Sequence, residues 1–418
     1  MCTSSQDFSI PAGGGTSGGP GVLIEPAPGA AEGATGTMQV TVEVAGQAPV
    51  TRDVRVRVGE GVNLAAGPEA EVTARFGANY TAPLSVANAG ETAAEGAAVL
   101  FINDYGIRAG ARYSNCTYVE DDLRSCAFDQ TLEPGVAYDA TLPYKLAPDT
   151  EAPGLQGGDV IWFTAAEFED FAGTLAGINV PLGEPGDGAA LELSEAAALR
   201  GRVQVDTEPT NDTTFVSVRV TGSNPADLAA VGDTVTGAKG TRVTATVGVT
   251  NKGPATIDPG RIGEPFTRIE VRVPPGTTAV AVPPDCVPVV GNDFQFDRAG
   301  QPGASRYVCD AGTFLAAGQT RTMDIRLRID TVTANATGTV RVNAPCPCTG
   351  RTRDVKPAND VAKILVNPAS TGGGGGGGGA DDGGLPITGS PTTTLVTVGL
   401  LLLVGGFAAV LATRRRRT

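Results

Sequence analysis

Few side chains in this 418-residue sequence are suited to acid–base or nucleophilic chemistry. The chain has no histidine, which removes the commonest general base and excludes the usual Ser-His-Asp and Cys-His arrangements. Carboxylates remain, in clusters at residues 120–122, at Glu167 with Glu169 and Asp170, and at residues 381–382. Such clusters are typical of a solvated surface, and they lack the spacing of an EF-hand calcium loop. We therefore predict no catalytic residue, no metal site and no cofactor.

The C-terminal tail combines a short motif, an apolar run and a basic end. The motif is Leu385, Pro386, Ile387, Thr388 and Gly389, and the 18 residues 395–412 beyond it carry no charge. As a helix with a rise of about 1.5 Å per residue, the run would span roughly 27 Å, close to a bilayer core. The tail ends in four consecutive arginines, which should stay on the cytoplasmic side: Arg414, Arg415, Arg416 and Arg417. We expect residues 395–412 to form a transmembrane helix that holds Thr388 just outside the membrane.

In this order, the tail resembles the cell-wall sorting signal of Gram-positive surface proteins with an LPXTG motif. The resemblance implies that the cysteine of a sortase attacks the carbonyl of Thr388, releases Gly389 and joins the chain to peptidoglycan. It also implies that Leu385 fills an apolar pocket, that Pro386 bends the peptide and that Ile387 occupies the free position. A plain membrane anchor is the alternative. On the sortase interpretation, this chain is the substrate of another enzyme.

Seven cysteines are present, and a surface location would be oxidising. Close pairs then predict disulfides between Cys116 and Cys126 and between Cys286 and Cys309. Cys346 and Cys348 could bond only in a strained ring, so a reducible bridge and a crosslink to another chain both stay open. Zinc is the weaker interpretation, because a Cys-x-Cys pair without histidine does not fit the usual ligand pattern.

Two stretches of the central region carry the same motifs in the same order. Asn88-Ala-Gly90 ends an alternating strand in the first stretch, and Asn251-Lys-Gly253 does so in the second. A further strand, a cysteine pair, a Leu-x-x-Gly turn and an alternating strand follow in both. Each stretch closes on Pro-x-Asn-Asp and a last strand, with the motif at residues 209–212 and 357–360.

Period-two alternation, β-branched residues and frequent Gly, Pro and Asn turns predict an all-β fold of tandem antiparallel β-sandwiches. In the clearest strand, residues 322–329, four apolar side chains would face the core and Arg326 and Arg328 would face water. Residues 160–164, with Trp162 and Phe163, should form a core strand. No long amphipathic helix is expected before the anchor, and a short helix could form at residues 195–200 with Ser194 as its N-cap.

The unit resembles the Ig-like repeats of bacterial surface proteins that form the domain of unknown function eleven family. Five motifs carry the resemblance: Asp227-Leu-Ala, Val-Thr-Asn-Lys-Gly-Pro at 249–254, Val-Pro-Pro-Gly at 273–276, Val308-Cys-Asp and Lys-Pro-Ala-Asn-Asp at 356–360. It covers residues 225–367 well. It covers residues 60–220 loosely, because this copy lacks the Pro-Pro-Gly and has an insertion around residues 163–193. The resemblance implies a fold and no particular activity.

Residues 1–59 predict either a partial Ig-like repeat or a flexible leader. Thr-Gly-Thr-Met-Gln-Val at 35–40 matches residues 337–342, and residues 54–58 match residues 216–220. Cys2 precedes the segment Phe-Ser-Ile-Pro-Ala-Gly at 8–13 much as Cys309 precedes Phe-Leu-Ala-Ala-Gly at 314–318, so Cys2 would be the second cysteine of an incomplete repeat. Residues 1–20 lack the basic and apolar regions of a signal peptide. Because a sortase substrate must be exported, we expect the true start to lie upstream or the gene to be a fragment.

The predicted organisation is a partial repeat or leader at 1–59, Ig-like sandwiches at 60–222 and 223–368, a Gly-rich linker at 369–384 and a sorting signal at 385–418. Eight consecutive glycines at 372–379 should make the linker flexible. The formal net charge is −14, and loss of the four terminal arginines would make it −18. That charge disfavours nucleic acid and anionic polymers as partners.

The predicted function is that of a cell-surface stalk or adhesin-type protein, not an enzyme, anchored to the wall of a Gram-positive bacterium. Its expected partners are a sortase, peptidoglycan, the membrane before cleavage and an unknown extracellular ligand. One alternative is an extracellular enzyme of the wall or of polysaccharide, which the single tryptophan and the 5% aromatic content argue against. Another is a receptor for a glycan or protein that binds through residues 106–112 or the insertion at 163–193.

Overall fold

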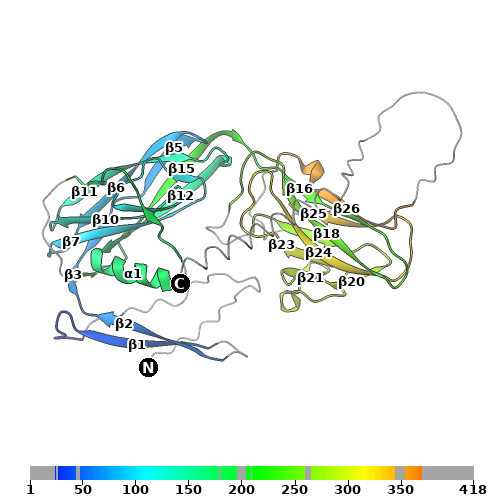
Figure 1. Cartoon of the computed structure of the whole chain (residues 1–418), viewed down its shortest axis with the longest axis horizontal. Coiled ribbons are helices and arrows are strands. Elements are labelled where there is room, and N and C mark those ends of the chain that lie inside the picture. Colours follow the sequence, from blue (N-terminus) through cyan, green and yellow to red (C-terminus); the bar gives the residue numbers. More distant parts are fainter. Residues whose placement is uncertain are drawn as a thin grey trace, which may run out of the picture. The chain divides into compact units, whose positions relative to one another are not determined.

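The computed structural model describes residue 24 and residues 27–43, 48–177, 180–194, 204–208, 210–258, 265–343 and 354–369. Within these ranges the chain is mostly β-strand, with one α-helix, α1 (Ala165–Gly177) (Figure 1). None of the described residues belongs to a helix that is both long and apolar enough to cross a membrane. The expected transmembrane helix at 395–412, the glycine linker and the short helix at 195–200 lie outside the described residues.

The first sandwich, as we call residues 62–224, packs a four-stranded sheet on a seven-stranded sheet. The four-stranded sheet has the order β4 (Leu64–Ala66), β6 (Asn79–Asn88), β11 (Ala137–Leu146), β8 (Ile107–Ala109). The seven-stranded sheet has the order β13 (Glu184–Pro185), β9 (Cys116–Val119), β10 (Asp122–Leu132), β7 (Ala94–Asn103), β12 (Ala152–Thr164), β15 (Thr213–Asn224), β5 (Ala70–Arg75).

The second sandwich, residues 226–366, repeats this arrangement. Its four-stranded sheet has the order β16 (Leu228–Val231), β18 (Arg242–Asn251), β24 (Thr320–Ile329), β20 (Thr277–Ala281). Its seven-stranded sheet has the order β17 (Asp233–Val235), β26 (Val361–Val366), β25 (Ala336–Arg341), β19 (Arg268–Arg272), β23 (Arg306–Asp310), β21 (Cys286–Val290), β22 (Asp293–Phe294). Read from the opposite edge, six strands of this sheet have counterparts in the first sandwich in the same chain order. The two-residue edge strands β22 and β13 occupy the same place but come from different parts of the repeat.

The strands are not all antiparallel, which corrects the sequence-based expectation. In the first sandwich β5 runs parallel to β15, and in the second β17 runs parallel to β26. A separate pair, β3 (Glu60–Val62) and β14 (Gln204–Asp206), is also parallel. Each parallel edge arises because the chain leaves the four-stranded sheet after its first strand and crosses over to the seven-stranded sheet. There β5 pairs with β15 and β17 pairs with β26, the strand that comes last in the chain of its sandwich. Period-two alternation predicts a strand but contains no information on the direction of its neighbour.

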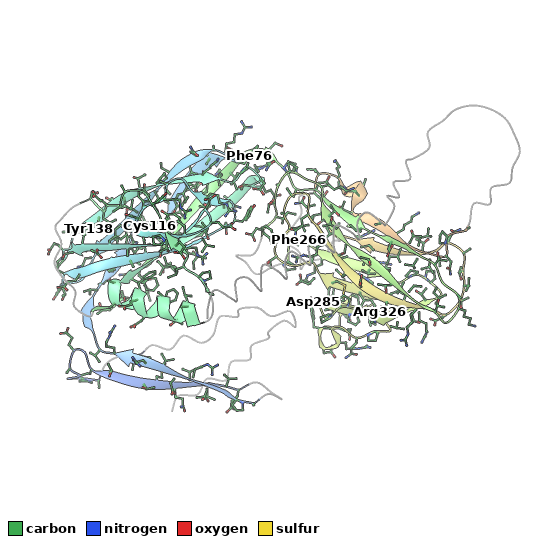
Figure 2. All side chains as sticks on the ribbon, in the orientation of Figure 1. Phe76, Cys116, Tyr138, Phe266, Asp285 and Arg326 are labelled. Atoms are coloured by element: carbon green, nitrogen blue, oxygen red, sulfur yellow. A yellow bond between two sulfur atoms is a disulfide. The ribbon has the colours of Figure 1, made fainter. Side chains whose placement is uncertain are left out.

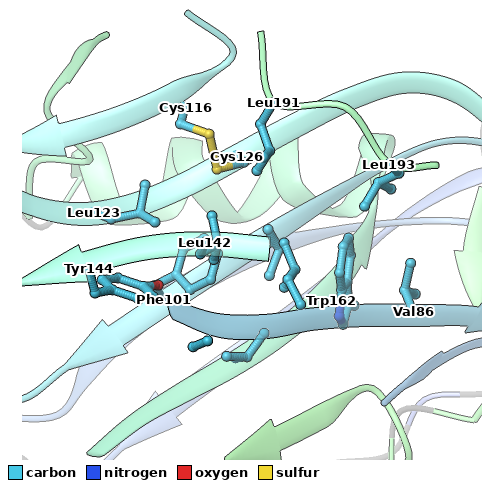
Figure 3. Close-up of a cluster of buried hydrophobic side chains, with 14 of the residues drawn as sticks. Val86, Phe101, Cys116, Leu123, Cys126, Leu142, Tyr144, Trp162, Leu191 and Leu193 are labelled. Carbon is cyan, nitrogen blue, oxygen red and sulfur yellow. A yellow bond between two sulfur atoms is a disulfide. The ribbon is translucent and has the colours of Figure 1, made fainter. Parts of the chain in front are cut away.

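The core of the first sandwich is built around Trp162, whose side chain is fully buried. Its indole Nε1 donates a hydrogen bond to the carbonyl of Ser85 at 3.1 Å, which joins the seven-stranded sheet to the four-stranded sheet. Figure 3 shows Trp162 in one apolar cluster with Leu142, Leu193 and the bridge between Cys116 and Cys126. Phe163 points the other way and packs on Phe171 of α1, with ring centroids 5.3 Å apart. The strand prediction for residues 160–164 is confirmed, with Trp162 alone of the two aromatics in the core.

The second core follows the alternation predicted for β24. Ile325, Leu327 and Ile329 are 0–1% exposed, whereas Arg326 and Arg328 are exposed. Met323 is half-buried against the same cluster. Burial of alternate apolar side chains stabilises such a strand by about 1.5–3 kcal/mol per large side chain.

Helix α1 was not expected from the sequence. It follows β12 directly and lies in the predicted insertion at 163–193, where it contacts β7 and β12. Thr164 Oγ1 accepts a hydrogen bond from the Glu167 backbone N–H, and the Glu167 carboxylate accepts from the Thr164 N–H, which together form a capping box. Burial raises the pKa of Glu167, and the hydrogen bonds from Asp206 and Thr164 oppose that rise. This Thr-x-x-Glu signature is the local sequence signal for the start of the helix.

A hairpin occupies part of the N-terminal segment. Strand β1 (Thr35–Val42) pairs with β2 (Val50–Arg57), and Met38 lies opposite Val54 as Val340 lies opposite Ala362 in the second sandwich. Val342 is fully buried, whereas its counterpart Val40 is 39% exposed. The hairpin therefore has the strand pairing expected of a partial repeat, without a buried face.

Candidate functional site

The residues assigned to sorting all lie outside the described residues. They are Leu385, Pro386, Ile387, Thr388 and Gly389 of the motif and Arg414, Arg415, Arg416 and Arg417 of the tail. Cys2, Cys346 and Cys348 also lie outside them. Among the described residues, the two sandwiches share disulfides and buried polar groups at equivalent positions. They differ in the charged groups around one of these positions.

Two disulfides occupy equivalent places. Cys116 pairs with Cys126 across β9 and β10, and Cys286 pairs with Cys309 across β21 and β23. In both sandwiches the bridge joins residues that face each other in the ladder and are at most 1% exposed. Each bridge thus fastens an outer strand of the seven-stranded sheet to the strand next to it.

A buried asparagine closes the same turn in each sandwich. The Asn88 Nδ2 donates to the carbonyls of Thr92 and Leu132, both at 2.8 Å, and its Oδ1 accepts from the Gly90 N–H at 3.0 Å. Asn251 makes the corresponding bonds to Ala255, Leu315 and Gly253, at 2.7, 3.3 and 3.1 Å. Both asparagines are fully buried. The repeated Asn-x-Gly of the sequence is therefore a hydrogen-bonded anchor between two turns, and not only a turn.

A second shared anchor precedes the Pro-x-Asn-Asp motif. The Asp206 carboxylate accepts from the backbone N–H of Leu64, and Asp354 accepts from that of Leu228, both at 2.7 Å. Each carboxylate also accepts from the backbone N–H two residues along the chain. The full repeated motif is Asp-x-x-Pro-x-Asn-Asp, and its first residue binds the start of the four-stranded sheet. Sequence comparison between the copies could have found it, since the aspartate lies three residues before the proline in both.

The surroundings of the anchors Asp206 and Asp354 differ in charge. In the second sandwich Asp227 is 1% exposed, accepts from Asn359 Nδ2 at 2.9 Å and lies 3.2 Å from Lys356 Nζ. Asp360 lies nearby, and burial, followed by the negative charge of Asp354, raises its pKa to about 6. In the first sandwich Asn63 takes the place of Asp227 and accepts from Asn211 at 3.0 Å.

The predicted acidic clusters act as structural or surface groups where they are described. Glu167 caps α1, Asp122 pairs with Arg124 at 3.0 Å, and Asp121 lies 3.7 Å from Arg112. Among the described residues, no group of three or more acidic or cysteine side chains is arranged to hold a metal ion.

The two regions proposed for ligand binding are more ordered than loops. Residues 107–109 form β8, and Arg112 lies over the Tyr118 ring with 4.5 Å between the guanidinium carbon and the ring centroid. The insertion contributes α1, the edge strand β13 and two buried leucines, Leu191 and Leu193. One internal space of the first sandwich, lined by Tyr80, Phe101, Leu142 and Tyr144, has a volume of about 10 Å³, which is room for one water.

No family model matches this chain, and no curated protein matches its sequence. Among solved structures, it is similar to the third cohesin of ScaC from Acetivibrio cellulolyticus, determined in complex with the ScaB dockerin. The identity is 10%, the TM-score is 0.21, and 38% of this chain and 99% of that chain are covered. It is also similar to the seventh ScaB type I cohesin from Pseudobacteroides cellulosolvens, with 10% identity, a TM-score of 0.20, and coverage of 40% of this chain and 96% of that chain. Similarity at this level says nothing about a ligand or partner of this chain.

Proposed function

We propose that this protein is a cell-surface stalk that a sortase cuts after Thr388 and joins to peptidoglycan. The proposal for anchoring is supported by the order of motif, apolar run and arginines at residues 385–417. The proposal for a stalk is supported by the repetition of one sandwich, in the same order for all strands but the edge pair β13 and β22, with a disulfide and two polar anchors at equivalent positions. On this proposal, the membrane holds the chain only until cleavage. An unidentified extracellular ligand is the remaining partner.

The proposal that the protein is a stalk rests mainly on the equivalence of the two sandwiches. A repeated module that buries its own core and clamps its sheet edges with disulfides can extend a chain without needing a ligand for stability. It also suits an oxidising, extracellular location, where such bridges persist.

Mass spectrometry of peptides released from the wall by a muramidase tests the anchoring. We expect a C-terminal peptide that ends at Thr388 and carries a peptidoglycan stem. A Thr388→Ala variant should remain in the membrane fraction, while a Thr393→Ala variant outside the motif should be processed normally. Mature surface protein that retains residues 414–417 would contradict the proposal.

A further inference from the structure

The outer face of the seven-stranded sheet in the second sandwich is rich in cations. Ile269 and Val271 point into the core, so strand alternation places Arg268, Glu270 and Arg272 of β19 on the outer face. The same alternation places Arg306 of β23, Arg341 of β25 and Lys363 of β26 on that face. We call the five cations the basic face: Arg268, Arg272, Arg306, Arg341 and Lys363.

The strand register brings these cations together. Arg272 lies opposite Arg306 on one side and Thr339 on the other, and Lys363 lies opposite Thr339. Arg341 lies opposite Glu270. Because neighbouring strands are about 4.8 Å apart, the five positive groups share four adjacent strands.

Glu270 orients part of this face. It is 8% exposed, and its carboxylate accepts from Arg272 Nε at 2.9 Å and from Arg306 Nη2 at 2.7 Å. Burial tends to raise the pKa of Glu270, but the hydrogen bonds from both guanidinium groups outweigh this and lower it. Fixed guanidinium groups lose less conformational entropy when they bind a partner than free ones do.

The face keeps a positive excess after its internal pairing. Glu270 offsets one of the five cations, and Asp310, opposite Arg268, offsets another. Arg268, Arg341 and Lys363 form no ion pair with any residue in the described ranges. Arg341 does lie close enough to Asp360 to lower the pKa of that carboxyl, so Asp360 offsets part of a third charge. The fold does not require this charge, because the equivalent positions of the first sandwich include Leu100, Ile102 and Ile161.

The complementary charge is present in the same chain. Residues 60–222 contain 25 acidic and 8 basic residues, a net charge of −17, whereas residues 223–368 contain 13 acidic and 16 basic residues, a net charge of +3. Helix α1 carries Glu167, Glu169 and Asp170 with no basic residue, and none of its residues is buried. Glu167 caps the helix, and Asp170 lies 3.3 Å from Arg57. The overall negative charge therefore comes mainly from the first sandwich, whereas the second sandwich carries a net positive charge.

We propose that the basic face binds the acidic first sandwich of a second copy of this chain. The contact joins two different surfaces, so it is head-to-tail and can be repeated from copy to copy. Each copy as a whole is negative, so the attraction is local: where the basic face meets the acidic first sandwich, the opposite charges attract and set the orientation. Both effects weaken as salt screens them. The proposal goes beyond anchoring and does not depend on it.

Isotope-mixed crosslinking of the full chain in a mild detergent tests the contact. Equal amounts of ¹⁴N and ¹⁵N protein are treated with a carbodiimide, which joins lysine directly to a carboxylate. At an ionic strength of about 0.02 M we expect mixed-isotope links from Lys363 to acidic residues within 60–222, and at about 0.5 M we expect them to disappear. Sedimentation in parallel should show association that falls with salt.

Matched variants separate this face from charge in general. Arg272→Glu with Arg341→Glu should weaken association about tenfold or more. Arg242→Glu with Arg326→Glu makes the same charge change on the outer face of the four-stranded sheet and should leave association in place (Arg326 is labelled in Figure 2). Lys363→Arg should keep association and lose only the Lys363 links. Thermal melts confirm that each variant is folded.

Three results would overturn the proposal. The first is a chain that remains monomeric at low salt. The second is an equal loss of association in the two double variants. The third is binding of a soluble polyanion such as heparin to the basic face with no association between copies, which would assign the face to a polymer instead.

Discussion

The two sandwiches have the same strand order and the same internal anchors, yet opposite charge. Asn88 corresponds to Asn251, Asp206 corresponds to Asp354, and the disulfides lie in corresponding ladders. On the outer face of the seven-stranded sheet, by contrast, Leu100 corresponds to Glu270 and Ile161 to Arg341. Inward positions and turns are constrained by packing and by buried hydrogen bonds, whereas outward positions are not. The comparison separates residues that build the module from residues that give each copy its own surface.

The largest expected difference between the two sandwiches is the loss of stability when a core side chain is truncated. Trp162→Ala should destabilise the first sandwich by about 4 kcal/mol, because a large cavity opens and the bond to Ser85 is lost. The equivalent position in the second sandwich is Val342, also fully buried, and Val342→Ala should cost roughly 2 kcal/mol. Calorimetry should show one transition lowered in each variant. If either variant lowers both transitions together, the cores are not independent.

The disulfides should rank by loop length. Removing the bridge between Cys286 and Cys309, which are 23 residues apart, should destabilise the second sandwich by about 3.4 kcal/mol. Removing the bridge between Cys116 and Cys126, 10 residues apart, should cost the first sandwich about 2.7 kcal/mol. Double Cys→Ser variants and chemical denaturation measure both. A reversed order would show that strain or residual structure in the unfolded chain outweighs loop entropy.

The asparagine anchors should be interchangeable in effect. Asn88→Ala removes the bonds to Thr92, Leu132 and Gly90, and each of the two variants should cost about 2 kcal/mol in its own sandwich. Asn251→Ala removes the bonds to Ala255, Leu315 and Gly253, and the Leu315 carbonyl keeps the bond from the Ile257 N–H. Asp at either position keeps the acceptor and loses the two donors, so its effect should be at least as large. A cost near zero at one site would break the equivalence.

The smallest effect concerns pH. The pKa of Asp360 is about 6 in the folded protein, above its ordinary value of 3.8, so the folded state binds the proton more tightly than the unfolded state. The stability of the second sandwich should therefore fall as pH rises from about 4 to 6 and then level off. Asp360→Asn should remove this slope and stabilise the second sandwich by about 1 kcal/mol at neutral pH, a value reduced for the partial exposure of the carboxylate.

The first sandwich supplies the control for that titration. Burial, which the hydrogen bond from Thr213 opposes, and the charge of Asp206 also raise the pKa of Asp212, but Asn63 there replaces the second buried carboxylate. Asp212→Asn should give a shift of the same sign and smaller size. Thermal melts of both variants at pH 4.5 and 7.5 measure the two effects, and equal shifts would remove any role for Asp227.

Much of the fold could be predicted from the sequence because the signals were local and repeated. Alternation placed β6, β11 and β24, and two Asn-x-Gly turns and two cysteine pairs marked the duplication. Helix α1 was missed because its apolar stripe is short, with Phe168, Phe171 and Leu175 as its large members, and is only partly buried on the sheet. The parallel edges were missed because the partners β5 and β15 are about 145 residues apart in the chain and share no local pattern.

The sequence by itself determined the alternating strands, the order of the repeated turns and the C-terminal motif on which the anchoring proposal rests. Each of these depends on neighbours within a few residues. Only the tertiary structure decided which cations share a face, since Arg272, Arg306, Arg341 and Lys363 come from four strands that the fold places side by side. The same is true of the carboxylates around Asp360, whose pKa depends on groups distant in sequence. Local spacing fixes backbone conformation, whereas charge acts through space and depends on where the folded chain brings its residues together.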